Sequence, residues 1–169
     1  MGVFKGARLS VGDLLERSVA FSADDVAQAG SDARVRLVWT VVDAAVKCRE
    51  LLSAGGSLLD CWRFGVLQSL DAYESLLRLH GVDTAAGVFR MEPPTCGAAE
   101  VDAALAALAE FLAARDGWDV PAWALVEDRS VREWFVSGVP AFEEWARQES
   151  PVAFARRGIW VTRGGLERV

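Results

Sequence analysis

The feature that most constrains the fold is a helical repeat of apolar residues. It is clearest in residues 100–115, where apolar side chains recur every three or four positions: Val101, Ala104, Leu105, Leu108, Phe111 and Leu112. This spacing places them on one face of an α-helix, and the following Gly117 is a residue type that ends helices. Residues 35–52 and 59–77 carry the same repeat. The repeat therefore predicts an all-α protein built around a helical bundle.

Local signals predict where these helices begin and end. Serines that suit helix N-caps precede the apolar stretches, and glycines follow them. Helix starts are expected at Ser10, Ser22, Ser31 and Ser57, and helix ends at Gly55-Gly56 and Gly81. Ser57 is followed three residues later by Asp60, the arrangement of a capping box. Long helices joined by short turns pack as antiparallel neighbours, so we expect residues 1–116 to form a helical bundle.

The chain after Gly117 differs from the bundle. Five of the seven tryptophans lie there. Before the last bundle helix, residues 82–99 are expected to be a loop, because they contain Pro93-Pro94 and show no periodicity. Short helices are predicted with a cap of Ser130 and Glu133, at 140–149 and at 150–157, followed by one extended run at 159–162. Residues 117–169 are therefore expected to form a Trp-rich C-terminal segment of short helices packed on the bundle.

Composition narrows the functional classes. The chain is 52% hydrophobic and 25% charged, with a net charge of −6, which excludes intrinsic disorder and argues against a general nucleic-acid binder. The charge is uneven: residues 91–150, the acidic segment, carry 4 basic and 12 acidic groups, whereas residues 151–169, the basic tail, carry 4 and 1. Arginine outnumbers lysine 16 to 2, which fits either GC-rich coding or a preference for arginine forks.

Cysteine usage and apolar stretches bear on the compartment. The three cysteines are widely spaced and form no C-x-x-C pair, so neither a zinc site nor a redox motif is indicated. The N-terminus lacks the apolar core of a secretory signal, and the most apolar stretch, residues 35–46, is too short to span a bilayer. We expect a cytoplasmic protein that does not enter a membrane.

The side chains of common catalytic sites are scarce. His80 is the only histidine, and its place before Gly81 suits an interaction with the end of a helix at least as well as general-base chemistry. Gly55-Gly56-Ser57 with Asp60 faintly resembles a nucleotidyltransferase turn, but the carboxylate pair for Mg²⁺ is missing and a helix cap explains it. We expect neither enzymatic activity nor a cofactor.

Tryptophan and arginine are instead the residues that dominate protein interfaces. The tail tryptophans serve either as a second small core or as interface anchors, and the tail arginines contact either phosphates or carboxylates. The residues predicted to contact a partner are Trp123, Trp134, Phe135, Trp145, Phe154, Arg156, Arg157 and Trp160. The alternative is a nucleic-acid-binding regulator that uses the arginines of the basic tail.

A resemblance supports the interface hypothesis. The tail contains the motifs Val120-Pro121-Ala122-Trp123, Glu133-Trp134-Phe135, Ser150-Pro151-Val152-Ala153-Phe154, Arg156-Arg157-Gly158-Ile159-Trp160-Val161 and Leu166-Glu167-Arg168-Val169. In these it resembles the tails of small antitoxin-like proteins of high-GC bacteria that are associated with nucleotidyltransferase-type toxins. The resemblance implies a non-catalytic protein that sequesters a protein partner, such as a nucleotidyltransferase-type or nuclease toxin. Association with a second copy of the chain stays open.

Overall fold

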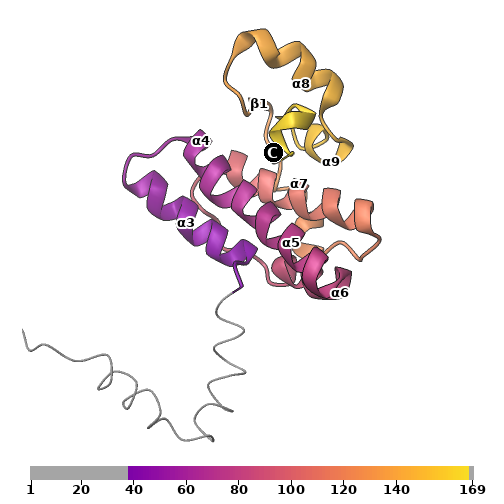
Figure 1. The fold of residues 1–169 in the computed structure, drawn as a ribbon. Helices are drawn as coiled ribbons and strands as arrows, with labels where there is room; N and C mark the ends of the chain where they lie inside the picture. Colours follow the sequence, from indigo (N-terminus) through magenta and orange to yellow (C-terminus); the bar gives the residue numbers. More distant parts are fainter. Residues whose placement is uncertain (1–37, 168–169) are drawn as a thin grey trace, which may run out of the picture. The chain divides into compact units, whose positions relative to one another are not determined.

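The computed structural model describes residues 38–167, which are mostly helical with one pair of very short strands (Figure 1). The all-α expectation is confirmed. In chain order the elements are α3 (Val41–Ser53), α4 (Leu58–Cys61), the π-helical turn η1 (Trp62–Val66), α5 (Leu67–His80), α6 (Val82–Ala86), the 3-10 turn η2 (Gly87–Phe89), α7 (Ala99–Asp116), η3 (Ala122–Leu125), β1 (Trp134–Phe135), η4 (Pro140–Phe142), α8 (Glu143–Glu149), α9 (Val152–Ala155), β2 (Ile159–Trp160) and η5 (Arg163–Gly165). The helices expected from Ser10 and Ser22 lie outside the described residues.

The helix start expected at Ser31 lies outside the described residues, but the apolar repeat of that helix continues through Val38 and Trp39. Residues 38–40 are not helical, and α3 begins at Val41. The cause is a capping box in which the Thr40 hydroxyl accepts a hydrogen bond from the Asp43 N–H, while the Asp43 carboxylate accepts one from the Thr40 N–H at 2.9 Å. The prediction of a helix through 38–40 is therefore wrong, because the local cap overrides the repeat.

The next helical stretch follows the prediction and adds one irregularity. Ser57 and Asp60 form the expected capping box, and the helix ends before Gly81, whose φ is +82°. Between α4 and α5 the chain widens into the π-helical turn η1. Gly65 lies in this turn, and a Cβ at this position would collide with the sulfur of Cys48 on α3. The missing side chain therefore allows η1 and α3 to approach closely.

The loop expected over residues 82–99 is only partly present. Residues 82–86 form α6 and 87–89 form η2, so the prediction is wrong for this half. The buried ring of Phe89 explains the difference, because it lies 6.0 Å from the rings of both Tyr73 and Trp118. This tertiary contact orders a segment that has no helical periodicity. Residues 90–98 contain no helix, as expected.

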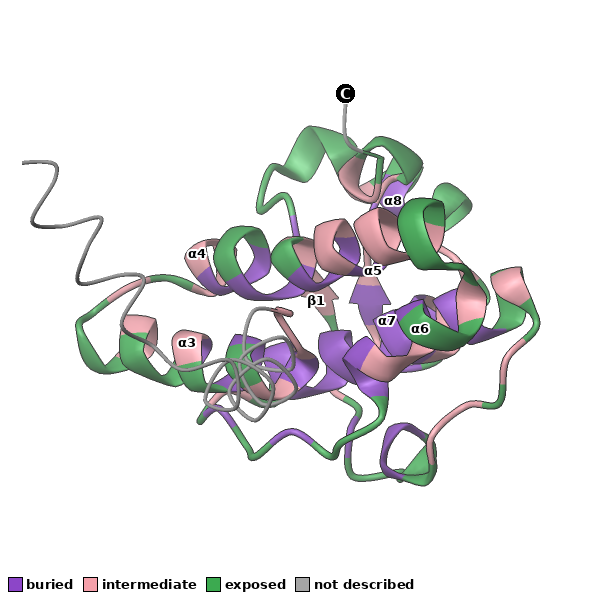
Figure 2. Ribbon diagram, turned by 60° about the horizontal axis from the view of Figure 1, so that its bottom comes forward, coloured by how far each residue is buried: buried purple, intermediate pink, exposed green. Residues whose placement is uncertain are grey.

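Helix α7 is the centre of the core. The prediction placed its large apolar residues on one face, but Figure 2 and the burial of its side chains show it covered on more than that face. The buried alanines include Ala103, Ala106, Ala107 and Ala109. Small side chains let neighbouring elements approach from several directions, and α3, α4, η1, η3, α9 and β2 all pack against α7.

Residues 39–167 belong to one compact unit, and the expected division at residue 116 falls inside it. A short helix capped by Ser130 and Glu133 was predicted, and this prediction is wrong. The chain there contains no helix and leads into β1, and β1 pairs in parallel with β2, with Trp134 opposite Ile159 and Phe135 opposite Trp160. The helices predicted near 140–149 and 150–157 and the extended run after Gly158 are confirmed, with shorter bounds.

Candidate partner-binding surface

The most exposed aromatic side chains of the tail lie in residues 139–149, which we call the aromatic arm. The arm consists of Val139, the 3-10 turn η4 and helix α8 (Figure 1). Pro140 at the first position of η4 fixes the backbone angle with which the turn begins. Phe142 and Trp145 are one helical turn apart, and their ring centres are 5.7 Å from each other. The two rings therefore form a pair on one side of the arm.

This pair is unusually open to solvent. Trp145 is 58% exposed, Phe142 40% and Val139 44%. The other tryptophans within residues 38–167 are buried or half-buried. Large apolar side chains gathered at one exposed place commonly mark a site of interaction, whereas single ones do not. The aromatic arm carries such a group of exposed apolar side chains, so it is a candidate interaction site.

The base of the arm is held firmly to the strand pair. The guanidinium of Arg147 lies 4.8 Å from the ring centre of Phe135 and 5.3 Å from that of Trp160, and its Nη2 donates a 2.8 Å hydrogen bond to Glu133. Ser150 donates to the Ile159 carbonyl at 3.1 Å. These contacts place α8 in one orientation relative to β1 and β2. The exposed rings are therefore presented in a fixed position.

Two residues predicted to contact a partner, Phe154 and Trp123, lie in the core instead, and Trp134 is half-buried. Phe154 is fully buried and packs edge-on against Trp62 and Phe111. Trp123 is buried and donates a 2.9 Å hydrogen bond to the Phe89 carbonyl. Trp134 lies edge-on to Trp62 at 5.9 Å. These three rings build the contact between the tail and the helices.

The predicted arginines bind a carboxylate of the acidic segment. Arg156 and Arg157 both pair with Glu110 on α7, the latter at 3.0 Å. Arg157 is buried and also donates a hydrogen bond to the Ala124 carbonyl. Sequence analysis left phosphates and carboxylates open as partners of these two arginines, and in the structure both pair with a carboxylate. No observation in residues 38–167 favours a nucleic-acid contact.

Phe142 and Val139 were missed by sequence reasoning. The signal was present in the spacing of Phe142 and Trp145, which is i, i+3, and in the neighbouring Glu143 and Glu144, which make this stretch amphipathic. Sequence analysis selected Trp145 from this stretch and did not extend the predicted surface to its apolar neighbours. In the structure only Ala146 of α8 is buried.

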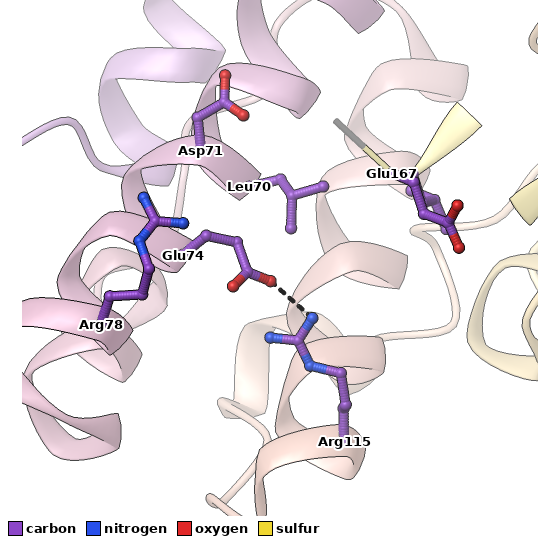
Figure 3. Close-up of a pocket in the computed structure, with 7 residues that line it drawn as sticks. Leu70, Asp71, Glu74, Arg78, Arg115 and Glu167 are labelled. Carbon is purple, nitrogen blue, oxygen red and sulfur yellow. Dashed lines mark hydrogen bonds and ion pairs between the residues drawn. The ribbon is translucent and has the colours of Figure 1, made fainter. Parts of the chain in front are cut away.

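A second candidate region is a cleft of about 500 Å³ between α5, α7 and the end of the described chain (Figure 3). Charged side chains dominate its walls: Asp71, Glu74, Arg78, Arg115 and Glu167 line it together with Leu70 and Leu166. The Arg115 guanidinium donates hydrogen bonds to Glu74 and to Asp116, each at 2.7 Å. The main cation of this wall is therefore engaged by two carboxylates.

Tyr73 extends this network beneath the cleft. Its hydroxyl donates to Asp116 at 2.7 Å and accepts from the Trp118 indole at 2.9 Å. Burial, followed by the bond to Asp116, raises the pKa of Tyr73 to about 12. The hydrogen bonds from Arg115 lower the pKa of Asp116. At neutral pH these groups hold fixed charges and protons, which is the behaviour of a structural network.

Within residues 38–167, His80 and the side chains able to bind a metal ion form no competing functional site. His80 is exposed at the end of α5, and its carbonyl accepts a hydrogen bond from Thr84. In residues 38–167 no three His, Cys, Asp or Glu side chains are grouped so that they hold a metal ion. Within the same range, no helix has both the length and the apolar character that crossing a bilayer requires.

Comparison with protein-family models, with curated proteins and with solved structures finds no match to this chain. The resemblance of the tail to antitoxin-like proteins gains no support from these comparisons and stays a prediction. The function therefore has to be argued from the geometry of the aromatic arm.

Proposed function

We propose that this chain is a non-catalytic protein-binding protein and that the aromatic arm is its contact surface. The observation that carries the proposal is the exposure of Trp145 beside Phe142 on a firmly held arm. Tryptophan is the residue type most enriched among interface hot spots. A preformed position also lowers the entropy cost of binding, because the rings need not be ordered at the moment of contact.

The charges around the arm favour a basic partner. Glu143 and Glu144 lie in the first turn of α8, between Phe142 and Trp145. The one arginine of α8 is Arg147, and Glu133 already binds it. The arm thus combines an apolar centre with an acidic border, and a partner with basic residues around an apolar pocket complements it.

A test compares two exposed apolar residues. Trp145→Ala removes the centre of the proposed surface, whereas Leu79→Ala removes a side chain that is 71% exposed on α5. Tagged wild type and both variants are recovered from the source organism, and the retained proteins are quantified. We expect one protein to be retained by wild type and Leu79→Ala and to be lost with Trp145→Ala, because a hot spot contributes about 2 kcal/mol, or roughly 30-fold in affinity.

Two results contradict this proposal. In the first, the three forms retain the same proteins in the same amounts. In the second, none of them retains a stoichiometric partner, and sedimentation shows only monomer. A concentration-dependent dimer that Trp145→Ala disrupts assigns the arm to self-association instead.

We further propose that the partner is a nucleic-acid-handling toxin which the chain neutralises. The support is the resemblance of the tail and the acidic segment, since enzymes that act on nucleic acid present basic surfaces to their substrates. The test is co-expression with the product of the neighbouring reading frame. We expect wild type and Leu79→Ala to restore growth and Trp145→Ala to fail. A neighbouring product that is harmless when expressed alone contradicts this narrower proposal and leaves the protein-binding role untouched.

A further inference from the structure

Three arginines converge on a second, separate cleft of about 480 Å³ in the tail. Arg129 follows η3, and Arg156 and Arg157 follow α9. The exposed side chains of Leu125 and Val126 form an apolar wall beside them. This cleft takes no part in the aromatic arm or in the proposed protein contact.

Two of the three arginine side chains, those of Arg129 and Arg157, are at least nine-tenths buried. Arg129 lies over the ring of Trp123 at 5.1 Å, and its Nη2 donates to the Pro93 carbonyl at 3.0 Å. Arg157 donates through Nη2 to the Ala124 carbonyl. Within residues 38–167, Nη1 of Arg129 and Nε of Arg157 have no hydrogen-bond partner. Both nitrogens are shielded from solvent, so they add positive charge next to the cleft but do not themselves contact what occupies it.

The carboxylates near the cleft neutralise the positive charges of the three arginines only in part. Glu110 is shared between Arg156 and Arg157 through the same Oε2 atom. Glu92 meets Arg129 at 3.3 Å but is itself largely exposed. Glu127 lies on the rim of the cleft and is exposed. Of the two buried arginines, Arg157 therefore shares its one carboxylate with Arg156, and Arg129 pairs with a carboxylate that is screened by water.

We propose that this cleft binds a small organic oxyanion with an apolar part, its phosphate or carboxylate group held by the arginines. Guanidinium groups match both oxyanions because their planar forks donate two parallel hydrogen bonds. Leu125 and Val126 supply the surface for the apolar part. The volume falls in the range of about 300–1,000 Å³ that is common for small-molecule sites.

The test uses the full chain, with hexyl phosphate and hexanoate as separate titrants in calorimetry. Arg156 is half-exposed, so Arg156→Gln is expected to fold and to weaken binding about tenfold through loss of a charge-assisted hydrogen bond. Glu127→Gln removes a repulsive charge and is expected to tighten binding about threefold. The matched controls are Arg90→Gln and Glu50→Gln, which change the same charges on exposed residues outside the cleft.

Tighter binding of hexyl phosphate identifies the oxyanion as phosphate, and tighter binding of hexanoate identifies it as carboxylate. Both results support the site when Arg156→Gln and Glu127→Gln shift the affinity in opposite directions and the controls change it less than twofold. The proposal is overturned if neither compound binds wild type at millimolar concentration. It is also overturned if Arg90→Gln weakens binding as much as Arg156→Gln does, because the effect is then one of overall charge.

Discussion

Replacing Glu110 with glutamine tests the contact that joins the basic tail to α7. The Glu110 side chain is 15% exposed and that of Arg157 is 6% exposed, so the variant leaves a buried guanidinium without its counter-charge. Removing one partner of a buried ion pair costs about 3–5 kcal/mol. Glutamine keeps one acceptor oxygen and Arg157 keeps its bond to Ala124, so we expect the lower end, about 3 kcal/mol. The half-exposed Arg156 adds less than about 1 kcal/mol.

The assay is unfolding in urea followed by tryptophan fluorescence. Arg156→Gln is the matched control and is expected to lower the free energy of unfolding by less than about 1 kcal/mol. The double variant Glu110→Gln/Arg157→Met removes both buried charges and is expected to recover most of the loss. A free energy of unfolding for Glu110→Gln within about 0.5 kcal/mol of wild type refutes the reasoning, since that is the range of changes at unimportant surface positions.

Two further predictions concern stability. Gly158→Ala is expected to lower the free energy of unfolding by at least about 3 kcal/mol, because φ is +75° at this position and the added Cβ collides with the Val131 carbonyl. Thermal unfolding that shows the variant to be as stable as wild type rejects this prediction. The pKa of Tyr73 is raised from 10.0 to about 12 in the folded protein. Its contribution to the free energy of unfolding is therefore complete below pH 10 and is lost as the pH rises to 12. Tyr73→Phe is therefore expected to remove up to roughly 3 kcal/mol of the alkaline decline in stability, and an identical decline in both proteins argues against it.

The helices of this chain were predictable where the local signal and the packing agree. The capping box of Ser57 and Asp60 and the stop at Gly117 depend on residues within one turn, so sequence patterns find them. The order of residues 82–89 was not predictable, because it comes from the packing of Phe89 against Tyr73 and Trp118. The strand β1 likewise depends on hydrogen bonds to a segment more than 20 residues away.

The candidate surface was predictable in its location but only partly in its residues. Composition placed it in the Trp-rich tail, and Trp145 is exposed there. Both Trp123 and Trp145 lie in short helical turns, and the sequence difference between them is local: Ala122 and Ala124 flank Trp123, whereas Glu144 precedes Trp145. Their burial is decided by long-range contacts, such as the hydrogen bond from Trp123 to the Phe89 carbonyl. The pairing of the tail arginines with Glu110 has the same origin.

The central claim is that the aromatic arm contacts a protein. Hydroxyl-radical footprinting of the free chain and of its complex with the recovered partner tests it most directly, because the method reports the accessibility of each aromatic ring. We predict that oxidation of Trp145 and Phe142 falls at least several-fold in the complex, while Phe64, which is also exposed but lies in η1, reacts equally in both. Equal oxidation of Trp145 and Phe142 in the free and bound forms, with protection elsewhere, contradicts the account.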